Sequence, residues 1–333
     1  MRKFIVVLIL FLGIAFVILS FGELKIIIKT LQKANLWFLL LAFLLQLSWF
    51  VINGLAYNSI YHLLKLKESI QKLTLLAAAS NFVNVIAPSA GMGGVVVFID
   101  DANRRGYSTS KVTVANALYL LFDYVAFLGI LALGLIVLVR RNDLGPSETI
   151  ASIVMLAIAI GLAFFLYLGA RSADQLGRAL AWTARLINRI VHPFIHREYL
   201  EEARAYTFAH EVAESLSNLP TKWQTLIYPL LWFIATKVLM MAILIASFLS
   251  FDVPFSAGTI IGGFSIGYLF LVVSPTPSGI GVVEGIMALA LNSLKVEWSQ
   301  AVVIILVYRA ITFWVPLGIG ALAFRSLHIN VEE

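Results

Sequence analysis

Cysteine is absent from this chain of 333 residues, and charged residues are scarce. Without cysteine the protein has no disulfide bonds, no thiolate metal ligands and no cysteine nucleophile. Charged residues make up only 13% of the chain and hydrophobic residues 61%. The mean hydropathy of +0.94 lies outside the range of soluble domains. These values predict a membrane protein that crosses the bilayer several times.

Signals for enzyme chemistry are also few. Residues 279–285, GIGVVEG, depart from the dinucleotide-binding pattern G-x-G-x-x-G at Glu284 and follow no predicted strand. His192 and His196 are separated by Pro193, which argues against a metal pair on a regular helix. Asp100 and Asp101 faintly resemble a metal-diphosphate site, but the charged end of a hairpin is the favoured explanation. We therefore predict no catalytic residues, no metal site and no cofactor.

Six apolar segments are long enough to cross about 30 Å of hydrocarbon as helices. The first, Phe4–Phe21, has no cleavage site of the signal-peptide type after it, so we expect it to be retained. The other five predicted spans are Leu36–Ile60, Val112–Val139, Ile150–Gly169, Trp223–Phe251 and Ala301–Phe324.

Two further apolar stretches are too short and are interrupted by proline and glycine. Because proline removes an amide donor and glycine tolerates tight turns, each stretch predicts a broken re-entrant hairpin rather than two crossings. The first hairpin joins Leu73–Ala87 to Gly91–Asp101, and the second joins Ala257–Val273 to Gly279–Leu294.

The two interruptions resemble each other, since PSAGMGGVV begins at Pro88 and PSGIGVVEG begins at Pro277. Short strings of this kind also recur by chance in loops, but here a long span precedes and follows each one. The pattern predicts one all-α transmembrane domain over 1–333. It contains two repeats of a span, a broken re-entrant hairpin and a second span, at about 36–139 and 223–324. Such duplications are frequent in transporters.

The distribution of the 24 lysine and arginine residues predicts the orientation. Most fall on one side if both termini are cytoplasmic and the hairpins enter from opposite sides, which makes the repeats inverted and favours the cell membrane. The polar insertion 170–222 predicts an amphipathic helix that ends near Pro193 and a second helix at Tyr199–Ser217. Its basic face fits either the anionic inner leaflet or water. The net charge of +6 comes without a nucleic-acid motif, so lipid headgroups are the expected partner.

Four ionisable residues fall inside predicted hydrocarbon: Asp123, Lys237, Glu284 and Arg309. Each costs roughly 2.5–3.5 kcal/mol if it faces lipid, so they must pair or line water. Asp123 and Arg309 follow their prolines, Pro88 and Pro277, at nearly equivalent distances. An inverted repeat would therefore bring them together near the centre. Such a pair would either hold the halves in register or release Arg309 to a lipid phosphate.

The second interruption predicts a helix that begins inside the membrane. If Gly281 caps this helix, Glu284 is its third residue, where the helix dipole favours a carboxylate. Glu284 would otherwise receive a headgroup amine or pair with Lys237 or Arg309. The free amides near Gly279 and Gly281 suit an anionic phosphate. The first interruption would offer the same from the other side, through Pro88, Gly91 and Gly93.

Four segments resemble the lysylphosphatidylglycerol synthase transmembrane family, the flippase-like membrane region of the multiple peptide resistance factor. They are NVIAPSAGMGG, DDANRRGYS, SPTPSGIGVVEG and YRAITFWVPLGIG, and the resemblance covers about residues 5–325. It implies a domain that moves aminoacylated phosphatidylglycerol or a related lipid between leaflets. It also implies these site residues: Pro277, Gly279, Gly281, Glu284, Tyr308 and Arg309, with Pro88, Gly91 and Gly93 matched more loosely.

Two departures from the family pattern matter. Many members place a glutamate where this chain has Val95, and the chain ends at Glu333, so we expect no synthase domain and no lipid aminoacylation. The leading hypothesis is a lipid translocase for a phospholipid or glycolipid headgroup. The alternatives are a membrane-embedded transferase and a lipid-binding partner subunit of a glycosyltransferase or synthase. A homodimer is compatible with the sequence.

Overall fold

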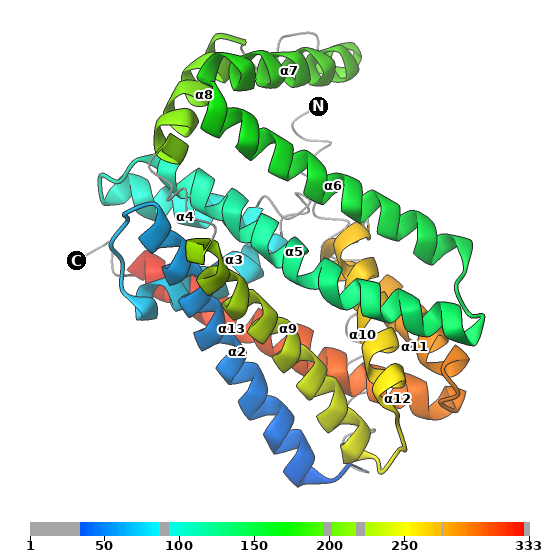
Figure 1. Ribbon diagram of the computed structural model, residues 1–333. Coiled ribbons are helices and arrows are strands. Elements are labelled where there is room, and N and C mark those ends of the chain that lie inside the picture. Colours follow the sequence, from blue (N-terminus) through cyan, green and yellow to red (C-terminus); the bar gives the residue numbers. More distant parts are fainter. Residues whose placement is uncertain (1–33, 87–92, 196–201, 218–223, 275, 330–333) are drawn as a thin grey trace.

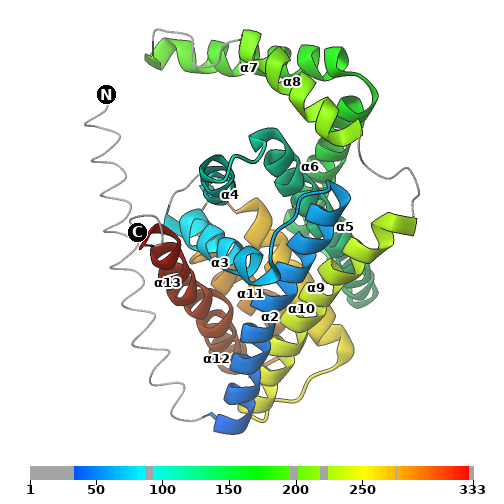
Figure 2. The ribbon, with the colours of Figure 1, turned by 90° about the vertical axis from the view of Figure 1, so that its left-hand side faces the viewer.

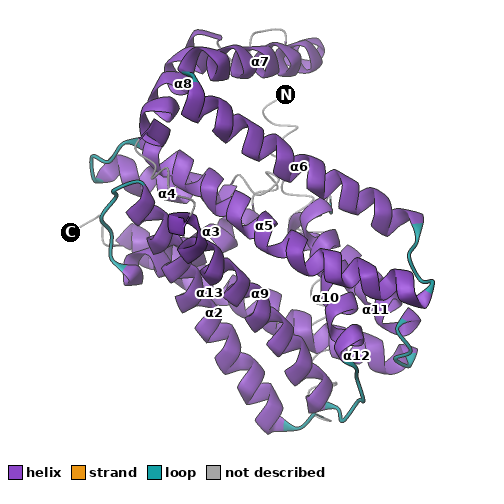
Figure 3. Ribbon diagram, viewed as in Figure 1, coloured by secondary structure: helices purple, strands orange, loops and turns teal. Residues whose placement is uncertain are grey.

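The described part of the protein is helical throughout. The computed structural model describes residues 34–86, 93–195, 202–217, 224–274 and 276–329, and within these ranges helices are joined by turns without any strand (Figure 1, Figure 3). The predicted all-α class is therefore confirmed. The first predicted span, Phe4–Phe21, lies outside the described residues.

Five helical segments among the described residues are long and apolar enough to cross a membrane. Their outward side chains are apolar, as lipid requires; Leu44 on α2 and Ile160 on α6 are about half exposed. They confirm five of the predicted spans. Four are single helices, and α12, a π-helical turn η2 and α13 together form the fifth: α2 Leu36–Leu63, α5 Thr109–Arg141, α6 Pro146–Arg171, α9 Gln224–Ser250, α12 Trp298–Arg309, η2 Ala310–Trp314 and α13 Val315–Ile329.

Side chains at the helix ends explain where several spans begin and stop. The Ser108 hydroxyl accepts a hydrogen bond from the amide of Lys111 and caps α5. α5 ends at Asn142, whose φ of 55° is left-handed, and Pro146 then starts α6 at a position where no amide donor is needed. These signals turn the chain back after one crossing.

The second predicted interruption is confirmed as a break between short helices, while the first falls on residues 87–92, outside the described ranges. The first separates α3 (Ile70–Ile86) from α4 (Gly93–Arg104). The second separates α10 (Ala257–Val273) from α11 (Val282–Ser293), with a short 3-10 turn, η1, at Pro277–Gly279. That these pairs re-enter the membrane from opposite sides stays a prediction. Pro88 and Gly91 lie outside the described residues.

The polar insertion forms two helices, α7 (Ala173–Ile195) and α8 (Glu202–Ser217). They lie as a layer across one end of the bundle (Figure 2). The first helix ends near Pro193, as predicted, since α7 stops two residues later at Ile195. A proline so close to a helix end removes only one hydrogen bond, and one further half-turn tolerates that loss. A hydrogen bond between Ser110 and Glu211 ties α8 to the start of α5.

The bundle is assembled from contacts between distant parts of the chain. α2 and α9 pack along each other, α3 packs on α13, and α10 packs on α5. Glycine permits close approach at two of these contacts. A Cβ on Gly134 of α5 would overlap the Ser265 side chain of α10, and a Cβ on Gly320 of α13 would lie 2.5 Å from the Ala78 carbonyl of α3. Between these helix pairs the structure leaves a cavity.

Candidate functional site: a polar cavity inside the bundle

A cavity of about 590 Å³ opens between α2, α3, α5, α9, α10 and the interrupted last span. Its volume falls in the range of small-molecule binding sites. The surrounding helices bury apolar cores on both sides, yet the cavity wall carries acidic, basic, amide and hydroxyl side chains. A polar cavity inside an apolar bundle is the strongest candidate for a binding site.

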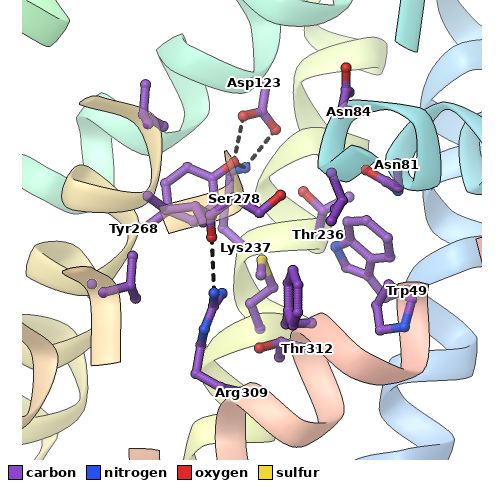
Figure 4. Close-up of a pocket in the computed structure, with 18 of the residues that line it drawn as sticks. Trp49, Asn81, Asn84, Asp123, Thr236, Lys237, Tyr268, Ser278, Arg309 and Thr312 are labelled. Carbon is purple, nitrogen blue, oxygen red and sulfur yellow. Dashed lines mark hydrogen bonds and ion pairs between the residues drawn. The ribbon is translucent and has the colours of Figure 1, made fainter. Parts of the chain in front are cut away.

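One charged group on this wall consists of Asp123 on α5, Lys237 on α9 and Tyr268 on α10. The Lys237 Nζ donates to the Asp123 carboxylate at 2.5 Å and also contacts the Tyr268 hydroxyl at 2.5 Å. The Tyr268 hydroxyl donates to the second Asp123 oxygen at 2.7 Å. The side chain of Lys237 is only 2% exposed, so the lysine end of this ion pair is buried in the protein. Three helices thus meet at one neutral charge cluster (Figure 4).

The second charged group forms where the chain is interrupted before α11. Ser278, Gly279 and Gly281 all have left-handed φ angles, of 50°, 70° and 76°, and this sequence of turns ends the helical path. Gly281 then caps α11, as predicted, and Glu284 lies in its first turn. Arg309 Nε donates to Glu284 at 2.5 Å. Arg309 also donates to the Ser278 carbonyl at 2.9 Å, as Figure 4 shows. Arg309 therefore links the turn before α11 to the last span by hydrogen bonds.

The expected pairing of Asp123 with Arg309 is wrong, although both side chains line the same cavity. Asp123 pairs with Lys237, and Arg309 pairs with Glu284. The physical reason is packing: α9 lies against α5 and α11 lies against α12, so each charge meets a partner from a neighbouring helix. Both pairs satisfy the requirement that charges inside the membrane be neutralised. The pairing of Glu284 with Arg309 was one of the alternatives that the sequence left open for Glu284.

The remaining predicted site residues have different places. Tyr308 is buried and lines the cavity beside Arg309. Glu284 and the glycines at 279 and 281 lie behind Arg309, in the turn that positions it, and Pro277 begins η1. Gly93 begins α4 and is buried. The remaining two, Pro88 and Gly91, fall outside the described ranges.

The π-helical turn η2 follows Arg309 directly. Single π-helical turns within α-helices occur often at functional sites. Thr312 and Phe313 lie within this turn and Tyr308 and Arg309 directly precede it, and all four side chains line the cavity. The Arg309 guanidinium also lies 5.0 Å from the centre of the Phe313 ring. The irregular turn thus concentrates cavity-lining residues on one short stretch.

Uncharged polar residues complete the wall, and the sequence analysis, which singled out ionisable residues, missed them. Gln46, Trp49 and Asn53 lie on one face of α2, while Asn81 and Asn84 lie one turn apart on α3. In sequence these residues have a weak signal: polar or amphipathic side chains at intervals of three and four in helices that are otherwise apolar. That spacing could have indicated an inward-facing polar stripe.

The acidic residues near the end of α4 do not form a metal site in the described structure. Asp100 pairs with Arg104 at 2.8 Å, and Asp101 pairs with Lys72 at 2.8 Å. Across the described ranges no group of three or more metal-ligating side chains of histidine, aspartate or glutamate is found. Both carboxylates thus take part in ion pairs, which accords with the charged end of a hairpin that the sequence favours.

The fold and the cavity together define a class: a multi-pass helical membrane protein with a polar chamber between its helices. Residues 4–320 match the family described as the lysylphosphatidylglycerol synthase TM region, and the chain belongs to this family. It is also 24% identical over 320 residues to a UPF0104 membrane protein of Methanothermobacter thermautotrophicus, with 94% of this chain and 91% of that protein covered. The family resemblance seen in the motifs is thereby confirmed.

Proposed function

We propose that this protein binds the headgroup of a membrane lipid in the cavity and moves that lipid between leaflets. The observation that carries the proposal is the polar cavity of about 590 Å³, enclosed by helices whose outer faces are apolar. A lipid needs such a division, since its headgroup requires polar contacts while its acyl chains can stay in hydrocarbon. We place the protein in the cell membrane with both termini cytoplasmic.

The two ion pairs suit a headgroup that carries both charges. Of the groups that line the cavity, Arg309 and Lys237 can each attract a phosphate and Asp123 can attract an amine, while Glu284 balances the charge of Arg309 from behind. In the structure these four groups neutralise one another. A zwitterionic or aminoacylated headgroup can replace each partner by a ligand group of the same charge, so that no buried charge is left alone. Exchange of partners, rather than entry into an already charged pocket, is the proposed binding step.

The packing of the helices supports access from two sides. The short helix α3 of the first half packs on α13 of the second, and the short helix α10 of the second half packs on α5 of the first. This reciprocal arrangement is what an inverted repeat produces. In transporters with such repeats, one half rocks against the other around a site at the interface. We infer that the cavity opens alternately toward the two leaflets.

The test is a lipid translocation assay in proteoliposomes with fluorescent acyl-labelled phosphatidylethanolamine and aminoacylated phosphatidylglycerol. We expect the wild-type protein to move at least one lipid faster than empty vesicles, and Arg309→Ala to reduce that rate at least tenfold. Arg104→Gln is the matched control, because its ion pair with Asp100 lies at the exposed hairpin end. Equal rates for empty vesicles, wild type and both variants would reject the proposal.

A further inference from the structure

Three polar side chains on the α2 and α3 wall of the cavity have no partner in the described part of the protein. The Gln46 amide makes no hydrogen bond although the residue is only 2% exposed. The indole nitrogen of Trp49, one turn further along α2, is buried without an acceptor. Asn81 on α3 lines the same cavity, and its amide is likewise without a partner among the described residues. These three residues are here called the amide wall.

The neighbouring polar groups on the cavity wall, unlike the amide wall, have hydrogen-bond partners within the protein. Asn53 accepts from the Tyr119 hydroxyl and donates to the Trp49 carbonyl. Asn84 accepts from the amide of Gly94 at 2.6 Å, and the Thr236 hydroxyl donates to the Phe233 carbonyl at 2.7 Å. Most buried polar groups in proteins are satisfied in this way. The buried Trp49 indole nitrogen lacks a partner at a cost of roughly 1–3 kcal/mol, and the Gln46 and Asn81 amides line the same cavity, where its contents can bind all three.

The chemistry of the amide wall identifies the partner. An indole N–H only donates, whereas each amide both donates and accepts. A phosphate can only accept and an ammonium group can only donate, so neither satisfies all three residues. Hydroxyl groups do both. The wall also carries no charge, and Figure 4 shows Trp49 and Asn81 on the side of the cavity opposite Asp123 and Arg309.

We propose that the amide wall binds the hydroxyl groups of a polyhydroxylated lipid headgroup, a sugar or a glycerol, beside the charged half of the site. This proposal rests on the proposed function, because it assigns a substrate class to the same cavity. Gln46 and Asn81 bind adjacent hydroxyls from two helices, and the Trp49 ring forms the apolar floor between them. The headgroup is thereby recognised in two parts, with charge on one wall and hydroxyls on the other.

The experiment compares three fluorescent acyl-labelled lipids in phosphatidylcholine proteoliposomes: glucosyl diacylglycerol, phosphatidylglycerol and phosphatidylethanolamine. We expect wild type to move at least one of the two hydroxylated lipids faster than phosphatidylethanolamine. Gln46→Leu and Asn81→Leu should each reduce the rate for that lipid about tenfold, the loss expected for one to two hydrogen bonds. The rate for phosphatidylethanolamine should stay within about twofold. Ser48→Ala, on the exposed face of α2, is the control.

The outcomes separate this inference from the proposed function. Transport of the glucosyl lipid would identify a sugar, and transport of phosphatidylglycerol alone would identify a glycerol. If wild type moves phosphatidylethanolamine but neither hydroxylated lipid faster, the amide wall has another role and the inference fails alone. If wild type moves none of the three, and aminoacylated phosphatidylglycerol no faster than empty vesicles do, the proposed function fails with it.

Thermal unfolding in detergent decides whether the amide wall is structural. Replacing an unpartnered buried amide by leucine should leave the unfolding temperature of Gln46→Leu unchanged or raise it. A lower unfolding temperature, together with equal loss of transport for every lipid, would show a packing role and overturn the inference.

Discussion

Replacing Lys237 tests whether the Asp123–Lys237 pair is buried as described. Lys237→Met keeps the length and apolar stem of the side chain but removes the ammonium group. Asp123 would then retain only the Tyr268 hydroxyl as a donor, at 2.7 Å. Removing one partner of a buried ion pair typically costs about 3–5 kcal/mol, because the remaining charge is left without compensation. With Lys237 only 2% exposed, we expect a value in this range.

A double variant isolates the charge from the packing. Combining Lys237→Met with Asp123→Leu removes both charges, and replacing a buried pair by apolar residues is often neutral or stabilising. We therefore expect the double variant to unfold within about 1 kcal/mol of wild type, so that the two substitutions are strongly non-additive. The measurement is reversible chemical unfolding in mixed micelles, followed by far-UV circular dichroism. A single variant as stable as wild type would refute the buried ion pair.

The same two variants decide between a structural and a functional ion pair. If the pair only holds the helices together, the stable double variant should translocate lipid at the wild-type rate. If Lys237 and Asp123 exchange partners with a headgroup, the double variant should fold normally and yet lose transport. This experiment decides whether the Asp123–Lys237 pair is structural or functional.

Three further predictions concern the backbone and the acidic residues. Gly281→Ala should lower the free energy of unfolding by about 1–2 kcal/mol, because φ is 76° there. Gly285→Ala lies four residues later at a helical site with open space around it, and it should raise the free energy of unfolding by about 0.5–1 kcal/mol. Gly134→Ala should lower the free energy of unfolding by about 1–3 kcal/mol, because the added methyl group overlaps α10. Gly129→Ala on the same helix meets open space and should not lower it. Thermal unfolding distinguishes the two variants. Asp101→Asn should change stability by about 1 kcal/mol or less, and elemental analysis should find no bound metal that this substitution removes.

The long spans and the interruptions could be predicted because they depend on local properties of the chain. Some 20 apolar residues suffice to identify a crossing helix, and prolines and glycines mark where a helix cannot continue. The capping role of Gly281 followed in the same way, since Glu284 stands three residues after it. Such features need no knowledge of which helices touch.

The partners inside the cavity could not be predicted because they depend on helix packing. Lys237 was identified as a buried charge, but its contact with Asp123 arises only when α9 lies against α5. Tyr268 has no signal in sequence that separates it from other aromatic residues of an apolar helix. Gln46 and Asn81 are single amides in apolar segments, and their missing partners become visible only once the neighbouring side chains are placed.

The charge balance of the cavity has a consequence for energetics. The two ion pairs contain two cations and two carboxylates, so the site itself contributes no net charge. A membrane potential of 100 mV acts on each elementary charge with about 2.3 kcal/mol. A zwitterionic or uncharged lipid carried by this site would leave that voltage without effect on its distribution. An anionic lipid would instead be driven toward the positive side of the membrane.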